Sequence, residues 1–257
     1  DCDTDGTRQV IWCGTAHTEA TYGNLYLGPK SYTAPKVTTS PTIDGVINAS
    51  EYANASTISV DNHTGYYDLE SGDDTWENGD NAYEAWVVHD ENAIYVAVDV
   101  TDDVIVTDTA SEGSEDGSTW EDDAVEIFFD ANNDKNTTYT NSSLTDHPAF
   151  EGQYVITPNN AWRDNEAGNP LYGESDDWYA LTTQTGAGYQ AEFKITKSAL
   201  LDPVDGTIMG FTIGLDDDDG SGRKLQLLWQ GRAHYEPSYG SLTLSSEGTA
   251  VPEWSLF

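Results

Sequence analysis

Basic side chains are scarce in this sequence. Its 257 residues include 10 Lys and Arg against 46 Asp and Glu, which gives a formal net charge of −36 at pH 7. A surface with this charge repels nucleic-acid phosphates and anionic membranes, so the composition excludes nucleic acid as a partner and favours cations, neutral polymers or basic surfaces. Because self-repulsion opposes compaction, bound divalent cations would stabilise the folded chain, and we expect structural Ca²⁺.

Cysteine is also rare. Cys2 and Cys13 are the two thiols, and no further Cys or neighbouring His completes a metal-ligand set, so we expect a disulfide that closes an N-terminal loop. No apolar run reaches about 18 residues, which excludes a membrane-spanning helix. No signal peptide is visible, and a start at Asp1 is consistent with a processed product that is secreted or held at the cell surface. Five sequons are candidate glycosylation sites: Asn48, Asn54, Asn62, Asn136 and Asn141.

Catalytic motifs are missing as well. The sequence has no Gly-X-Ser-X-Gly elbow, no His-Glu-X-X-His pair and no phosphate-binding loop, and its five histidines are scattered. Met209, the single methionine, lies in an apolar context that favours core packing over haem ligation. We therefore expect no catalytic residues. The two carboxylates of a glycosidase cannot be recognised against this acidic background.

Strand patterns dominate what the sequence does contain. Ala85–His89 and Ala93–Val100 are apolar runs joined by three polar residues, which predicts a β-hairpin. The one helical turn is expected near Thr196–Leu201, before Asp202-Pro203. Regular spacing predicts an all-β, jelly-roll-like antiparallel β-sandwich, with Trp86 and Trp229 in its core. Further strands are expected at Ala124–Asp130, Gly152–Thr157, Trp178–Gln184, Tyr189–Ile195, Thr207–Leu215, Lys224–Trp229 and Gly240–Leu244.

The first 37 residues differ from the rest. Val10–Trp12, Leu25–Leu27 and Pro35–Val37 are short strand-like pieces that cannot build a core of their own. The predicted organisation is an arm over residues 1–37 and a sandwich domain over residues 38–257. Such an arm either packs on its own domain or completes the sheet edge of a neighbour.

The segment Trp120–Asp134 combines three features. An aromatic residue opens it, a strand with a carboxylate at Glu126 follows, and Asp130, Asn132 and Asp134 then offer oxygen atoms at every second position. A charge inside a strand requires pairing, hydrogen bonds or a solvated cleft. Alternating oxygen ligands are typical of loops that bind hard cations, although Lys135 stands where an EF-hand loop needs glycine. Asp216 and Asp218 form a second candidate metal pair.

Six blocks in order resemble family 9 carbohydrate-binding modules and their DOMON-like relatives. The resemblance covers residues 38–246 and implies a calcium-stabilised β-sandwich that binds glycans without cleaving them. The blocks are Pro41–Ile47 with Glu51-Tyr52, Ala85–Asp103, Trp120–Asp130, Tyr189–Ile195, Gly210–Asp217 and Pro237–Leu244.

The same resemblance implies a glycan site. Trp120 matches one of two aromatic rings that clamp a sugar in the family, and Glu126 matches a polar residue beside it. The chain departs from the pattern at the second tryptophan, where it has His234 and Tyr235, and at an expected arginine, where it has Val155. Aromatic faces pack on sugar rings while polar groups bind the hydroxyls, so the candidate glycan residues are Trp120, Glu126, Gln153 and Tyr235. The alternative is that Trp120 and Tyr235 only pack on the edge of the sandwich and on a loop.

Two functions follow as hypotheses. The first is a secreted, non-catalytic protein that binds a neutral glycan or polysaccharide. The second is a structural subunit of an extracellular filament or surface layer, which self-associates through the arm by strand addition.

Overall fold

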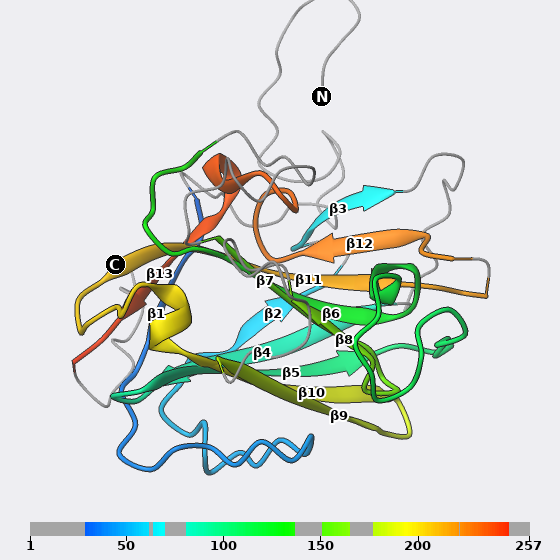
Figure 1. Cartoon of the computed structure of the whole chain (residues 1–257), viewed down its shortest axis with the longest axis horizontal. Coiled ribbons are helices and arrows are strands. Elements are labelled where there is room, and N and C mark those ends of the chain that lie inside the picture. Colours follow the sequence, from blue (N-terminus) through cyan, green and yellow to red (C-terminus); the bar gives the residue numbers. More distant parts are fainter. Residues whose placement is uncertain are drawn as a thin grey trace, which may run out of the picture.

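The protein is described by a computed structural model over residues 29–61, 64–69, 81–136, 151–164, 177–220 and 222–246. Its strands form two stacked sheets (Figure 1). The larger sheet has eight strands in the order β1-β13-β11-β6-β7-β8, with β12 pairing β11 and β3 pairing β12. The smaller sheet has the order β2-β4-β5-β10-β9. The predicted antiparallel β-sandwich is confirmed, and the one parallel pair among the described strands is β1 with β13.

The elements follow the expected order closely. The strands are β1 (Ser31–Ala34), β2 (Ile58–Val60), β3 (Tyr66–Leu69), β4 (Ala82–His89), β5 (Ala93–Thr101), β6 (Ala124–Asp130), β7 (Glu151–Ile156), β8 (Trp162–Asp164), β9 (Trp178–Gln184), β10 (Gly188–Thr196), β11 (Ile208–Asp217), β12 (Leu225–Leu228) and β13 (Gly240–Leu244). The 3₁₀ helices are η2 (Thr119–Glu121), η3 (Lys197–Leu200) and η4 (Glu236–Ser238). The predicted helical turn is η3, and the predicted hairpin is β4–β5, with His89 opposite Ile94.

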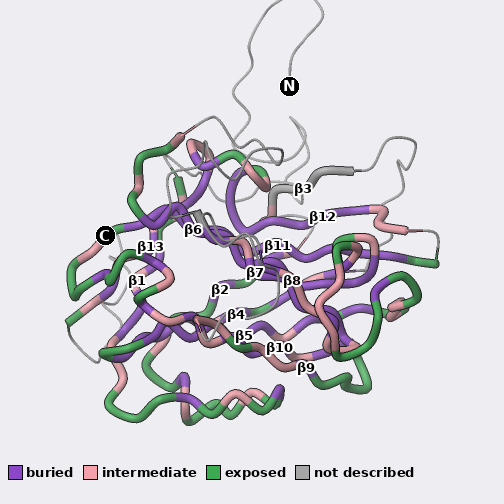
Figure 2. Tube along the Cα trace, viewed as in Figure 1, coloured by how far each residue is buried: buried purple, intermediate pink, exposed green. Residues whose placement is uncertain are grey.

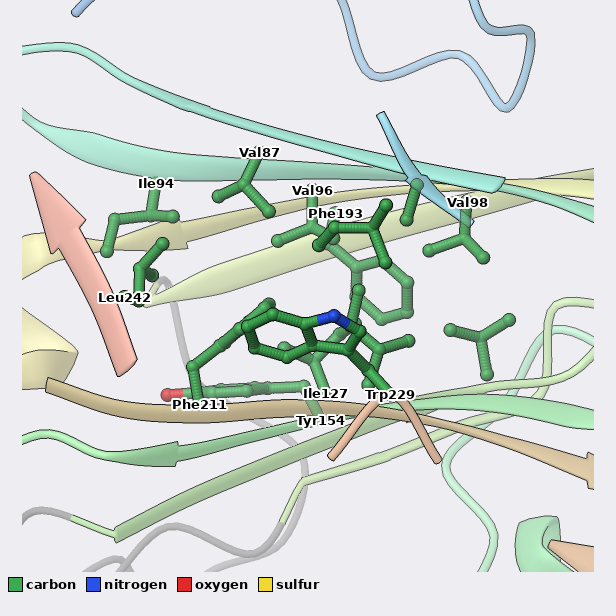
Figure 3. Close-up of a cluster of buried hydrophobic side chains, with 14 of the residues drawn as sticks. Val87, Ile94, Val96, Val98, Ile127, Tyr154, Phe193, Phe211, Trp229 and Leu242 are labelled. Carbon is green, nitrogen blue, oxygen red and sulfur yellow. The ribbon is translucent and has the colours of Figure 1, made fainter. Parts of the chain in front are cut away.

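The main core lies between the two sheets (Figure 3). Residues of alternating position point inward from each strand, because successive side chains of a strand point to opposite faces. Val96, Val98 and Phe193 from the smaller sheet face Ile127 and Phe211 from the larger one. Most of β5, β6 and β11 is buried, whereas many connecting segments are exposed (Figure 2). Trp229 and Met209 belong to this core, as predicted.

A second apolar cluster lies on the outer face of the smaller sheet. Tyr52, Val88 and Tyr95 form its centre, and Trp86 packs against them while its indole nitrogen donates to Thr57 Oγ1 at 3.1 Å. Trp86, which was predicted as a core residue, packs in this second cluster and not between the sheets, because alternation along β4 puts Val87 inward and Trp86 outward. The cluster is covered by residues 37–55, the blue segment below the smaller sheet in Figure 1.

The end of the predicted arm joins the larger sheet. β1 pairs in parallel with β13, and Lys36 then bridges to His89 on β4, so this part of the chain spans both sheets. Cys2 and Cys13 lie outside the described residues, as do the strand-like pieces at 10–12 and 25–27. No helix among the described residues is long and apolar enough to cross a bilayer. Of the sequons, Asn48 and Asn54 are exposed, Asn136 is half-buried, and Asn62 and Asn141 lie outside the described residues.

Candidate glycan site

Polar side chains form a connected row on the outer face of the larger sheet. In β6, Val125, Ile127 and Phe129 point into the core, which leaves Glu126 and Phe128 on the outer face. Register sets their neighbours: Phe128 lies opposite Gln153 of β7, and Glu126 lies opposite Gly214 of β11. A Cβ at Gly214 would lie at ordinary contact distance from Phe128, Gln226 and Glu126, so Gly214 lies beside the row.

Glu126 is the centre of this row and is 1% exposed. Gln153 Nε2 donates to its Oε1 at 3.1 Å, and Gln226 Nε2 donates to its Oε2 at 2.8 Å. Burial raises the pKa of Glu126, while Arg223 and the hydrogen bonds from its neighbours oppose the rise. The sequence predicted Glu126 and Gln153 as site residues, and the structure brings the two together. Because both of its oxygens accept amide hydrogens, Glu126 orients Gln153 and Gln226 toward the outer face.

Trp120 lies next to this row. It belongs to η2, one turn before β6, and is 40% exposed, an unusual exposure for a large aromatic side chain. The guanidinium of Arg223 lies 5.2 Å from the centre of its ring, and Arg223 Nη1 pairs with Asp216 Oδ1 at 3.1 Å. Gln226 Nε2 donates to the same Asp216 oxygen at 3.0 Å. The chain Trp120–Arg223–Asp216–Gln226–Glu126 therefore links an exposed aromatic face to the buried polar row.

The two residues that replace the second family tryptophan lie elsewhere on this face. His234 packs edge-on against Phe128, with ring centres 5.2 Å apart, and burial followed by Arg223 and Arg163 lowers its pKa to about 4. Tyr235 is 42% exposed, but no contact of its ring with Trp120 is present among the described residues. The structure thus places Arg223, and not Tyr235, over the Trp120 ring.

At Val155, where the family pattern has an arginine, the structure places an arginine on the neighbouring strand. Val155 lies opposite Arg163 of β8 in the strand register, so a guanidinium is carried by the neighbouring strand. Arg163 Nη1 donates to the Gly117 carbonyl at 2.7 Å, which ties β8 to the loop before Trp120. Sequence reasoning missed Arg163, Arg223 and Gln226. The Leu-Gln-Leu alternation at Leu225–Leu227 was a signal for Gln226, because it puts that residue on the outer face.

Three acidic groups could each hold a cation. Asp130 and Asp134, both predicted, meet Glu236, whereas the predicted Asn132 hydrogen-bonds to Asp134 through its amide nitrogen at 3.0 Å. Asp218 meets Asp108 and Asp122. The predicted partner Asp216 does not join Asp218: it points to the outer face and pairs with Arg223.

The third group consists of Asp102, Asp123 and Asp217, which are all buried and were not predicted as ligands. They lie at the ends of β5 and β11 and just before β6. Asn81 comes just before Ala82, which pairs with Thr101, the residue before Asp102. Asn81 is 1% exposed, and neither atom of its side-chain amide has a hydrogen-bond partner among the described residues. The fully buried Tyr189 hydroxyl also has no partner, and the four carboxylates that raise its pKa after burial include all three of this group. Three carboxylates with ligand atoms within 4.8 Å of one another form an oxygen-rich set that suits Ca²⁺.

The protein is thus a β-sandwich that has a row of polar side chains and an exposed tryptophan on one outer face. A family model described as "Carbohydrate family 9 binding domain-like" matches residues 43–247. The chain belongs to this family.

Two curated relatives are enzymes of much greater length. The chain is 27% identical to endo-1,4-beta-xylanase A of Thermoanaerobacterium saccharolyticum over 205 residues. The aligned region covers 79% of this chain and 15% of the relative. It is also 27% identical to exoglucanase XynX of Acetivibrio thermocellus over 184 residues. Here the aligned region covers 69% of this chain and 15% of the relative. The chain thus spans only a small part of both relatives.

Solved structures support the same fold. A family 9 carbohydrate-binding module of Caldicellulosiruptor kristjanssonii in complex with cellotriose superposes with a TM-score of 0.63 at 23% identity, covering 87% of this chain and 98% of the other. A module from the same organism in complex with glucose gives a TM-score of 0.61 at 22% identity, covering 88% and 100%. A putative carbohydrate-binding protein of Bacteroides uniformis gives 0.58 at 15% identity, covering 85% and 100%.

Proposed function

We propose that this protein binds a neutral glycan, without cleaving it, on the outer face of its larger sheet beside Trp120. The single observation that carries the proposal is the exposed Trp120 ring next to the row formed by Glu126, Gln153 and Gln226. An apolar ring face suits the C–H face of a pyranose, and oriented amides suit its hydroxyls. Because Arg223 covers one side of the indole, the sugar packs on the other side or displaces the guanidinium.

The family and the relatives support the same role. Modules with this fold were solved with cellotriose and with glucose, so β-glucans and their fragments are the first glycans to test. The curated relatives are a xylanase and an exoglucanase, of which this chain matches about a seventh. We therefore propose an accessory role in which the domain holds an extracellular enzyme on its polysaccharide, and secretion is part of this proposal.

Calorimetric titration with cellotriose, xylotriose and glucose tests the proposal. Trp120→Ala is expected to weaken binding by about 30-fold, the loss of about 2 kcal/mol that an aromatic hot spot carries. Tyr179→Ala is the matched control, because Tyr179 is 52% exposed on β9, an edge strand of the other sheet. Equal affinity of the Trp120→Ala variant and the unmodified protein would refute this site.

We also propose that Ca²⁺ stabilises the fold at Asp102, Asp123 and Asp217. The proposal is supported by three buried carboxylates within reach of one ion and by the unpartnered polar groups of Asn81 and Tyr189. Buried carboxylates are costly without a counter-charge, which a divalent cation supplies. Binding of Ca²⁺ measured by calorimetry is expected to be lost in Asp102→Asn and kept in Asp103→Asn, whose side chain is exposed.

The filament hypothesis rests on the predicted arm over residues 1–37, of which the first 28 lie outside the described part, and it stays a prediction. The described end of the arm pairs with β13 of its own domain.

A further inference from the structure

A cavity of about 390 Å³ lies at the η3 end of the sandwich. η3 is the yellow helix at the left of Figure 1, whereas η2 with Trp120 is the green helix at the right. The cavity is lined by Lys36 and Lys197, by acidic side chains, and by Pro203 and Val204. Two amines around one cavity are notable in a chain that has 10 Lys and Arg among 257 residues.

The two lysines of this cavity differ in their partners. Lys36 Nζ pairs with Glu91 at 2.7 Å and with Asp205 at 2.9 Å, so its ammonium is neutralised. Lys197 is 6% exposed, and the ion pairs among the described residues do not include it. Its Nζ lies instead 3.3 Å from His89 Nδ1.

His89 fixes how this amine is held. Its Nε2 lies 2.9 Å from the Ser245 carbonyl oxygen, and its Nδ1 lies 3.3 Å both from Lys197 Nζ and from the Asp90 carbonyl oxygen. In the tautomer with the proton on Nε2, Nδ1 is an acceptor for Lys197. The imidazole is fully buried, and burial lowers its pKa, while its contacts with the Ser245 and Asp90 carbonyls oppose this. Burial and the nearby Lys36 lower the pKa of Lys197, opposed by Asp205, Glu91 and Asp90. A lowered pKa enlarges the share of a lysine's neutral form, which is the nucleophile.

We propose that Lys197 is a covalent capture site for small neutral hydroxyaldehydes, the chemical class of an open-chain reducing sugar. After the ammonium gives a proton to water, the Nζ lone pair attacks the aldehyde carbon, a C–N bond forms and the carbonyl oxygen becomes a hydroxyl. That hydroxyl leaves as water with a proton from the nitrogen, so amine and aldehyde give imine and water. Glu91, Asp202 and Asp205 line the same cavity, and their charge disfavours anionic aldehydes.

Reductive labelling tests this site without depending on the glycan site. The full chain is treated with limiting glycolaldehyde and cyanoborohydride at pH 7, and mass spectrometry follows labelling at each lysine. Lys197 is expected to react faster than the half-buried Lys194, because Lys197 lines the cavity and a lowered pKa gives more free amine. Lys30 is the control for a lowered pKa without the cavity: it is half-buried, burial lowers its pKa to about 8, and it does not line this cavity. Its Nζ donates to the Thr64 and Trp229 carbonyls, so it is expected to stay unlabelled.

Three further measurements complete the labelling experiment. Glyoxylate, an anionic aldehyde, is expected to label Lys197 more slowly than glycolaldehyde does. Lys197→Arg is expected to remove the fast labelling while leaving the thermal unfolding temperature and glycan binding unchanged. In urea, all lysines are expected to react alike. Labelling of Lys197 at the rate of Lys194 in the folded protein, or only after unfolding, would overturn the proposal.

Discussion

Removal of Ca²⁺ is predicted to make the stability of this protein depend steeply on pH. Burial raises the pKa of Asp102 to about 6, and burial together with Asp102 raises that of Asp123 to about 9, both above the ordinary value of 3.8. Without a cation, the fold therefore favours the protonated acids. Their contribution to stability is fully present below about pH 4 and is lost as the pH rises through 6 and then 9. Bound Ca²⁺ favours the ionised acids and opposes this loss.

The expected magnitude follows from Asp102. Its shift of about two pKa units corresponds to about 3 kcal/mol at 1.36 kcal/mol per unit. For a domain of this size, about 3 kcal/mol changes the unfolding temperature by roughly 6–12 °C. Between pH 4 and pH 8 the unfolding temperature of the chelated protein is thus expected to fall by at least this amount more than that of the calcium-loaded protein, because the loss at Asp123 adds to the loss at Asp102.

Scanning calorimetry at pH 4, 6 and 8, with excess Ca²⁺ or with a chelator suited to each pH, measures this difference. Asp102→Asn is expected to abolish the calcium effect and to remove the Asp102 part of the pH effect, while Asp103→Asn behaves like the unmodified protein. Identical unfolding temperatures with and without chelator at pH 8 would refute the reasoning, because three buried carboxylates would then need no cation.

Three further results are expected. Phe211→Ala, which empties a fully buried ring position between the sheets, lowers the free energy of unfolding by about 3–5 kcal/mol in denaturant titration; a loss below about 1 kcal/mol would contradict the core described. Gly188→Ala destabilises by about 1–3 kcal/mol in the same assay, because its φ is +141° and a Cβ would lie 2.0 Å from the Val100 carbonyl; an unchanged midpoint would contradict this backbone. NMR of His234 shows a neutral ring at pH 5 that titrates only near pH 4; titration near 6.5 would show that the ring is solvated.

The strands and the family block Trp120–Asp130 could be predicted because both are local in sequence. Alternation along Ala124–Asp130 identified β6 with its correct ends, and the spacing of two apolar runs identified the β4–β5 hairpin. Trp120 and Glu126 were identified by a motif, and the structure places them near one another through Arg223 and Gln226.

The contacts of the acidic side chains could not be predicted in the same way, because they join strands that are distant in sequence. Asp216, Asp217 and Asp218 are consecutive, yet each serves a different cluster: Asp216 joins Arg223, Asp217 joins Asp102 and Asp123, and Asp218 joins Asp108 and Asp122. Alternation turns neighbours in β11 to opposite faces, but the register of β11 with β6 and β12 decides what they meet. That register is set by long-range packing, so the pairing of Asp216 with Asp218 could not be judged from the sequence.

A crystal structure of the protein soaked with cellotriose tests the central claim most directly. We expect a sugar ring stacked on Trp120, with its hydroxyls within hydrogen-bond distance of Gln153 or Gln226. A glycan bound at any other surface, with the outer face beside Trp120 free at saturating ligand, would contradict the account.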